Sequence, residues 1–565
     1  MSEHVDVLIV GAGLSGIGAA HHIQTAFPGK TYAILEARDA MGGTWDLFRY
    51  PGVRSDSDMQ TLGYRFRPWT EAKAIADGPS ILRYVRDTAT EAGIDQHIRY
   101  HHRVTRASWS STDARWTVEA THGTETAVLT SSFLLVCSGY YRYDHGYQAE
   151  LPGIGNFRGQ VVHPQQWPEN LDYAGKRVVV VGSGATAVTL VPAMAGTAGH
   201  VTMLQRSPTY IISLPTEDPI DARFRKLFGT RRAYTLTRWK NVLVSTLIYQ
   251  LSQHRPRMMR NWIRNMTIRQ LPAGYDVDTH FKPVYNPWDQ RLCLVPDGDL
   301  FRAIRHRQAS VATGRIETFT EHGVRLESGE VLAADIVVTA TGLQLLALGG
   351  IELAVDGHDI SLPGTMAYKG MMLSGVPNFA FTIGYTNASW TLKADLVSEY
   401  VCRLLGYMDS RGYDQCVPVN DDPRVTERPL LDFAAGYVLR AIDQFPRAGS
   451  RAPWRLGMSY LNDLITLRHG KIDDGTMRFS RLAKVRRPAR AVPPRLTANP
   501  GGDHQLGGAI GLAELTTVAA TATTRAARHA PYLAALVHGY HVAFLADAAV
   551  MLAASLTALV LPAVS

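Results

Sequence analysis

Two glycine-rich turns, each directly after a run of apolar residues, constrain the fold of this chain more than any other feature. The first, VDVLIVGAGLSG, places Gly11, Gly13 and Gly16 in the spacing GxGxxG. Glycine there permits a tight turn, close approach of the backbone to a pyrophosphate, and packing of a helix on a strand. A second apolar strand, TYAILEAR, follows, and its Glu36 is suited to accept hydrogen bonds from ribose hydroxyls. We therefore predict a dinucleotide site for an unphosphorylated ribose, as in FAD.

The second turn has the opposite preference at the ribose. KRVVVVGSGATA places Gly182, Gly184 and Ala187 after a valine-rich strand, and the next strand, HVTMLQRSP, ends in Arg206 and Ser207. An acid at this place would repel a 2′-phosphate, whereas arginine and serine bind one. We predict that NADPH binds here.

Two such sites in one chain indicate electron transfer between two cofactors. A length of 565 residues with 46% apolar and 19% charged residues is typical of a globular protein of two or three domains. The cysteines are scattered and form no CxxC pair, which argues against a disulfide reductase and a zinc site and suits a reducing cytoplasm. They are Cys137, Cys293, Cys402 and Cys416. The N-terminus shows no signal-peptide pattern.

The segment between the two turns carries a second kind of signal. In FRGQVVHPQQWP, the fixed residues are Phe157, Gly159, His163, Trp167 and Pro168. They match the fingerprint F-x-G-x-x-x-H-x-x-x-W-P, so the chain resembles the type I Baeyer–Villiger monooxygenases, within the class B flavin monooxygenases. A second signature of that family, in GGTWDLFRYPGVRSD, is met by Gly42, Gly43, Trp45, Tyr50, Pro51, Gly52 and Asp56. Stretches such as YNPWDQRLC and GSRAPWRL are similar to the mycobacterial subgroup that activates thioamide prodrugs.

The resemblance implies a reaction. In that family NADPH reduces FAD, dioxygen adds to form a C4a-peroxyflavin, and ketones become esters or lactones, while sulfides and thioamides are also oxygenated. Two alternatives stay open. One is a monooxygenase restricted to nitrogen and sulfur, and the other is a flavin- and NADP-binding redox sensor without turnover.

The resemblance also implies roles for single residues. Arg291 corresponds to the catalytic cation, which a permanently charged guanidinium suits. Gln290 stands where the family has lysine, so NADPH selectivity would depend more on Arg206 and Ser207. Asp56 corresponds to the acid that pairs with this arginine, although Asp58 is near enough to exchange roles.

By the same likeness, Gly43, Thr44 and Trp45 line the flavin. His163 is expected to act in domain rotation, with direct proton transfer as the alternative. Trp167 and Pro168 would stiffen the crossing between domains. No metal site is expected.

We predict an α/β fold with two Rossmann-like dinucleotide-binding domains, a helical insertion and an atypical apolar C-terminal tail. The FAD domain is expected to comprise 1–140 and 372–490, and the NADPH domain 150–210 and 289–371, with the insertion at 211–288. Residues 491–565 are expected to form a basic, proline-rich linker and the apolar tail.

Charge is concentrated in one segment. The net charge is +8, and residues 221–270 hold twelve Lys and Arg against one acid, Asp221. Such a segment could meet anionic lipid, or it could be a solvated helical face. It has no interleaved aromatic pattern typical of nucleic-acid modules.

The tail includes seventeen uncharged positions at 548–564 and resembles the end of a major facilitator drug transporter. It would anchor the chain to a membrane or dock on the enzyme as an amphipathic helix. The cysteine pattern and the lack of a signal-peptide pattern predict a cytoplasmic location. The basic segment and the tail make the inner face of the cell membrane the alternative.

Overall fold

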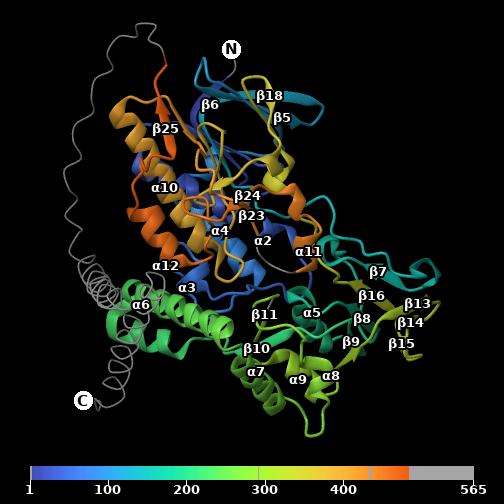
Figure 1. Ribbon diagram of the computed structural model, residues 1–565. Coiled ribbons are helices and arrows are strands. Elements are labelled where there is room, and N and C mark those ends of the chain that lie inside the picture. The colour runs from blue at the N-terminus through green and yellow to red at the C-terminus, as the bar shows by residue number, and fades with distance from the viewer. Residues whose placement is uncertain (1–2, 291, 432–434, 483–565) are drawn as a thin grey trace. The chain divides into compact units, whose positions relative to one another are not determined.

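The computed structural model describes residues 3–290, 292–431 and 435–482 (Figure 1). By its contacts the chain divides into two units, 1–483 and 484–565, and the described residues belong to the first. The expected linker and tail at 491–565, and the expected catalytic Arg291, lie outside the described residues.

The first sheet begins at the first glycine turn. Its strand β1 (Glu3–Val10) lies between β2 (Tyr32–Leu35) and β6 (Glu125–Val136), and both pairings are parallel. Val7 and Ile9 of β1 pack on one face of the sheet, and Leu8 and Val10 pack on the other. A continuous apolar run is what a parallel strand buried on both faces requires.

Further strands extend this sheet on both sides. Parallel strands β3 (Ile98–Arg99) and β21 (Phe379–Phe381) pair with β2 and β6. Strands β4 (Arg103–Ser110) and β5 (Arg115–His122) form an antiparallel meander with β6. The meander is continued by β17 (Glu352–Val355), parallel to β4, and by β18 (His358–Asp359).

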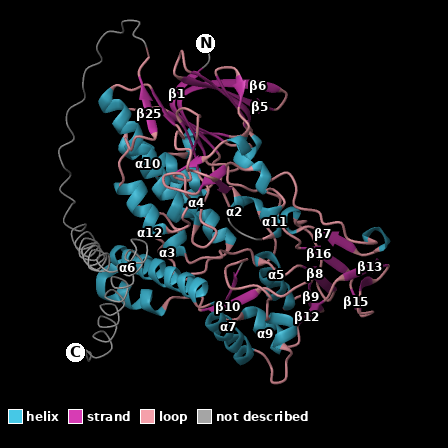
Figure 2. Ribbon diagram, viewed as in Figure 1, coloured by secondary structure: helices cyan, strands magenta, loops and turns pink. Residues whose placement is uncertain are grey.

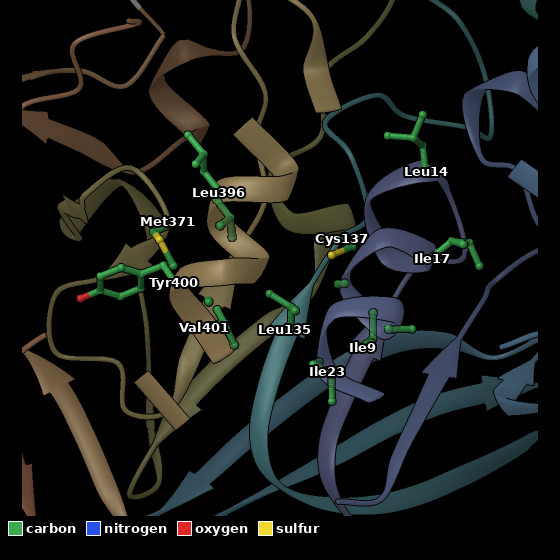
Figure 3. Packing of buried hydrophobic residues seen from close by; sticks show 14 of the residues in the cluster. Ile9, Leu14, Ile17, Ile23, Leu135, Cys137, Met371, Leu396, Tyr400 and Val401 are labelled. Atoms are coloured by element: carbon green, nitrogen blue, oxygen red, sulfur yellow. The ribbon is translucent and has the colours of Figure 1, made fainter. Parts of the chain in front are cut away.

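Helices α1 (Leu14–Ala26) and α10 (Trp390–Arg411) pack side by side on one face of this sheet. Figure 3 shows Ile17 and Ile23 of α1 near Leu135 of β6, with Leu396 and Val401 of α10 beside them. Helix α4 (Gly78–Glu91), capped by Asp77 through a 2.9 Å hydrogen bond from the Ser80 amide, joins the same core. This core fixes the first glycine turn at the N-terminus of α1.

The second sheet repeats the arrangement around β8 (Arg177–Val181). All pairings are parallel, in the order β12 (Ala309–Thr313), β9 (His200–Gln205), β8, β16 (Ile336–Thr339) and β7 (Gln160–Val162). Helices α5 (Ala185–Ala195) and α9 (Asp299–Arg305) cover one face. The α/β class with two Rossmann-like sheets is confirmed, and part of the expected connector, β7, is an edge strand.

Helices occupy most of the interval between β10 (Tyr210–Leu214) and β11 (Leu292–Pro296), which pair in parallel. They are α6 (Pro219–His254), with a non-helical Gly229, α7 (Pro256–Gln270) and α8 (Val277–Phe281). Buried Arg238 of α6 donates to the carbonyls of Gln60 at 2.7 Å and Gly63 at 2.8 Å. Its guanidinium is 3.4 Å from Asp395 of α10, so α6 is fixed to the first half of the molecule.

Smaller elements complete the described part (Figure 2). The short strands are β13 (Ile316–Thr320), β14 (Gly323–Leu326), β15 (Val331–Ala333), β19 (Ala367–Tyr368), β20 (Met372–Leu373), β22 (Gln415–Pro418), β23 (Glu427–Pro429), β24 (Arg447–Gly449) and β25 (Met477–Ser480). The short helices are α2 (Thr44–Leu47), α3 (Met59–Leu62), α11 (Gly436–Leu439) and α12 (Tyr460–Asp463).

The chain crosses between the two sheets on adjacent segments. Tyr141 forms a β-bridge with Leu345, and the amide of Arg142 donates to the carbonyl of Gln344 at 2.8 Å. The return crossing therefore follows β16 directly, and β17 at 352–355 already belongs to the first sheet. The expected boundary at residue 371 is wrong, because 352–359 form strands β17 and β18 of the first sheet.

Among the described residues, no helix is both long enough and apolar enough to cross a membrane.

Candidate functional site

A cavity of about 850 Å³ lies where the first glycine turn, the second turn and the helical segment approach one another. Many predicted residues line it: Gly11, Gly13, Glu36, Gly42, Gly43, Thr44, Trp45, Tyr50 and Asp56. From the second turn, Ala185 and Thr186 reach its wall. One cavity therefore extends from the first glycine turn to the second.

The first turn is built so that only glycine fits. Gly11 has φ +100°, and a Cβ on it would lie 2.7 Å from the carbonyl oxygen of Cys137. A Cβ on Gly16 would lie 1.9 Å from the carbonyl oxygen of Gly11. Gly13 caps α1 without a side-chain hydrogen bond, so the amides of the first helical turn are open to an anion.

Glu36 lies directly after β2 and is buried. Its carboxylate accepts hydrogen bonds from the amide of Ala12 at 2.8 Å and the amide of Arg38 at 3.0 Å. These bonds hold the carboxylate at the cavity wall beside the glycine turn. The remaining lone pairs are available to ribose hydroxyls.

The GGTW segment forms the opposite side of this cradle. A Cβ on Gly43 would lie 3.1 Å from Cα of Gly13, so the two backbones approach closely. The hydroxyls of Thr44 and Tyr143 are 3.2 Å apart, and burial raises the pKa of Tyr143 to about 12. Trp45 lines the cavity and packs against the first core.

Beneath α2 lies a buried carboxylate that the sequence pattern does not single out. Asp46 is 2% exposed and is 2.6 Å from Arg38 and 2.9 Å from Arg86. Because a buried charge is costly without partners, the two guanidiniums fix α2 in place. In the sequence, the only indication that Asp46 fixes this segment is its position directly after the GGTW motif.

The segment 50–58 joins the first half to the second. Gly52 has φ +75°, and a Cβ on it would lie 2.6 Å from Cβ of Ala193 of α5. Arg54, another residue that sequence reasoning missed, is 2.5 Å from Asp299 of α9. The aromatic-Pro-Gly motif thus packs on the second domain.

Asp56 and Asp58 both line the cavity, but Asp58 has a structural task. Its carboxylate caps α3 through the amide of Thr61 at 3.0 Å and accepts from Asn241 of α6 at 2.8 Å. Both carboxylates therefore lie at the cavity wall, and the assignment of the reaction to Asp56 stays a prediction.

The second turn has matching geometry around Gly182. Its φ is +142°, and a Cβ on it would lie 2.3 Å from the carbonyl oxygen of Ala340. Around Gly184, the N-cap of α5, a Cβ would meet no described atom within 4 Å, which leaves room for a ligand. Ala187 is fully buried between helix and strand.

Arg206 and Ser207 are exposed just beyond β9. The carbonyl of Ser207 accepts a hydrogen bond from Ser183 Oγ at 3.3 Å, so this loop lies beside the second turn. Gln290 forms a bridge with Pro287 and does not line the cavity. The structure thus places the loop of Arg206 and Ser207 beside the predicted phosphate-binding turn.

The connector holds His163 against the crossing segments. His163 Nδ1 accepts from the amide of Gln165 at 3.2 Å, and Gln165 Nε2 donates to the carbonyls of Arg142 and Tyr143 at 2.8 and 3.1 Å. Burial lowers the pKa of His163. His163 is not among the described residues that line the cavity, and its role in domain rotation stays a prediction.

The other fixed residues anchor the connector on the second sheet. Phe157 is buried edge-on against Phe319, and a Cβ on Gly159 would lie 2.3 Å from the carbonyl oxygen of Asp335. Trp167 packs against the core of this sheet.

Aromatic residues that the motifs did not predict complete the cavity wall. Trp390, the first residue of α10, donates to Ser15 Oγ at 2.7 Å and contacts Tyr140, with ring centroids 5.1 Å apart. The N-terminus of α10 therefore faces the cavity, where its dipole favours negative charge.

These features define a class, a flavin-binding monooxygenase with two dinucleotide folds. The flavin-binding monooxygenase-like family matches residues 74–347, and an NAD(P)-binding Rossmann-like domain matches residues 9–76. The chain belongs to the family of FAD-containing monooxygenases. It is 59% identical over 483 residues to the FAD-containing monooxygenase EthA of Mycobacterium tuberculosis, covering 85% of this chain and 99% of EthA. With EthA of Mycolicibacterium smegmatis the identity is 55% over 482 residues, covering 85% and 98%.

Solved structures show the same fold at low identity. A steroid monooxygenase bound to NADP matches with a TM-score of 0.67 and 22% identity, over 85% of this chain and all of that chain. A closed structure of cyclohexanone monooxygenase matches with a TM-score of 0.62 and 21% identity, over 74% and 87%.

Proposed function

We propose that this flavin monooxygenase uses NADPH and dioxygen to convert ketones to esters or lactones and also oxygenates sulfides and thioamides. The observation that carries the proposal is the single cavity that joins both glycine turns. A flavin at the first turn and a nicotinamide cofactor at the second would then share one substrate space. The names of the EthA relatives and the solved monooxygenases support the same class.

We assign the residues of the two glycine turns to two different cofactors. FAD, when bound, would supply the redox chemistry. Gly11, Gly13 and the open amides of α1 would hold its pyrophosphate, and Glu36 would bind its ribose. We assign the first sheet to FAD and the second to NADPH, with the helical segment as part of the substrate wall.

Catalysis on the substrate is assigned to Arg291, with Asp56 as its orienting partner. A guanidinium stays protonated and offers several donors to the developing oxyanion. Asp56 contributes a carboxylate at the cavity wall. We place the enzyme in the cytoplasm, consistent with its scattered cysteines.

Arg291→Ala tests the catalytic assignment. NADPH should still reduce the flavin at the normal rate, while ester formation should fall by about a hundredfold or more. The matched control is Arg305→Ala, an exposed arginine at the end of α9. Ester formation at the normal rate in Arg291→Ala would contradict the assignment.

Arg206→Glu tests the NADPH assignment. A carboxylate beside the second turn should repel the 2′-phosphate, so KM for NADPH should rise by at least about tenfold while KM for NADH changes little. Steady-state rates of cofactor oxidation measure both values. Equal changes for both cofactors would show that Arg206 does not recognise the 2′-phosphate.

A further inference from the structure

The helices α6 and α7 carry an unusual concentration of exposed apolar side chains. Nine of the sixteen exposed large apolar residues in the described part lie on these two helices. They are Ile220, Leu227, Phe228, Leu236, Val244, Leu247, Met258, Trp262 and Ile268. Leu227 is 72% exposed and Phe228 47%, just before the non-helical Gly229.

The charge around these side chains has one sign. Six basic residues of the two helices, and Arg255 between them, are exposed and have no ion-pair partner among the described residues. They are Arg223, Lys226, Arg231, Arg232, Arg255, Arg257 and Arg269. The other basic residues are largely engaged, since Arg225, Lys240 and Arg264 form ion pairs and Arg238 is buried. What reaches the surface is therefore a mixture of apolar and cationic side chains.

The same two helices form the rim of the cavity. Val244 of α6 and Trp262 of α7 line the cavity and are 47% and 44% exposed, and Ile220 at the start of α6 is 43% exposed. On α6 the residues Leu236, Lys240, Val244 and Ile248 are spaced by four and share one helix face. Lys240 on this face is paired with Asp218, and the exposed apolar side chains of the two helices continue into the cavity wall at Ile220, Val244 and Trp262.

From these observations we propose that α6 and α7 form a docking face for an anionic lipid surface and that the cavity opens onto that surface. Apolar side chains enter the boundary between headgroups and acyl chains, and arginine and lysine bind the anionic headgroups. Substrates dissolved in the lipid then reach the cavity without crossing water. The access route rests on the proposed function, whereas the docking face does not.

Vesicle binding by the full-length protein tests the docking face. Co-sedimentation with vesicles of phosphatidylcholine mixed with phosphatidylglycerol should exceed that with phosphatidylcholine alone, and high salt should weaken it. The pair Leu227→Ser and Phe228→Ser should weaken binding by about tenfold or more, and so should the pair Arg231→Gln and Arg232→Gln. Equal binding to both vesicles, or binding that neither pair weakens, would overturn the proposal.

Matched control pairs lie outside these two helices. Val331→Ser with Ile465→Ser removes comparable exposed apolar side chains, and Arg305→Gln with Arg307→Gln removes comparable charges. Neither pair should alter vesicle binding. Light scattering on the same samples tests whether a second copy of the chain binds this face instead of lipid. Such a copy would appear as a dimer that the pair Leu227→Ser and Phe228→Ser dissociates. That result, with unchanged vesicle binding, would also overturn the proposal.

The access route has its own measurement. Turnover of a long-chain ketone held in anionic vesicles should fall in the Leu227→Ser and Phe228→Ser variant, while turnover of a short water-soluble ketone should stay unchanged. If neither ketone is oxidised by the unaltered protein, the proposed function fails but vesicle binding still tests the docking face. Equal turnover of the vesicle-held ketone in both proteins would overturn the access route.

Discussion

At the residue scale, the ring of His163 leaves no room for a side chain at Gly146. A Cβ on Gly146 would lie 1.9 Å from His163 Cε1, so Gly146→Ala must displace the imidazole. Because this ring lies against the crossing between the two sheets, we expect flavin reduction by NADPH to slow by about tenfold or more. Anaerobic stopped-flow absorbance measures this rate. His163→Ala removes the ring, so the double variant Gly146→Ala with His163→Ala should reduce flavin as fast as His163→Ala alone. A slower double variant would show that the clash with the ring is not the cause.

A second prediction at this scale concerns Glu36. Glu36→Gln replaces one carboxylate oxygen with an amide that cannot accept a hydrogen bond from both Ala12 and Arg38. The variant also loses the charge that strengthens a hydrogen bond from a ribose hydroxyl, which is worth about 1.5–3 kcal/mol, so FAD should dissociate at least about tenfold more readily. Fluorescence titration of the apoprotein with FAD measures the change. An unaltered Kd would exclude Glu36 from flavin binding.

At the element scale, α6 is joined to α3 and α10 by the buried Arg238. Arg238→Leu leaves the Gln60 and Gly63 carbonyls without this donor and removes a partner of Asp395, so the free energy of unfolding should fall by about 3 kcal/mol or more. Urea unfolding followed by circular dichroism measures it. The control is Arg232→Leu, an exposed arginine of the same helix, and equal loss in both variants would contradict the proposed anchoring.

The elements also show which features are local enough to predict from the sequence. Both glycine turns and their strands are predicted because a strand, a tight turn and a helix follow one another directly. The domain boundary predicted at residue 371 is wrong because β17 pairs with β4, which lies nearly 250 residues earlier in the sequence, and no local pattern shows such a pairing. Pairings such as Arg54 with Asp299 depend on the folded chain and leave no local pattern. The role of Asp46 could not be predicted either, since the sequence does not distinguish a buried carboxylate from one at the surface.

At the scale of the whole molecule, a half-buried histidine links stability to pH. Burial lowers the pKa of His21 from 6.5 to about 4, and its ring stacks on Phe66 at 3.6 Å. The unfolded chain then binds more protons than the folded one between pH 6.5 and 4, so stability is lost as pH falls through this range. His21→Gln should make the urea midpoint less dependent on pH there. The exposed His322→Gln serves as control, and an unchanged slope in His21→Gln would contradict the prediction.

The central claim is that one oxygen atom from dioxygen enters the substrate at the expense of NADPH. Mass spectrometry of the product formed from a simple ketone under ¹⁸O₂ tests it most directly. The account predicts an ester or lactone carrying one heavy oxygen, in proportion to the NADPH consumed. Consumption of NADPH that yields only hydrogen peroxide from every ketone, sulfide and thioamide tried would contradict it.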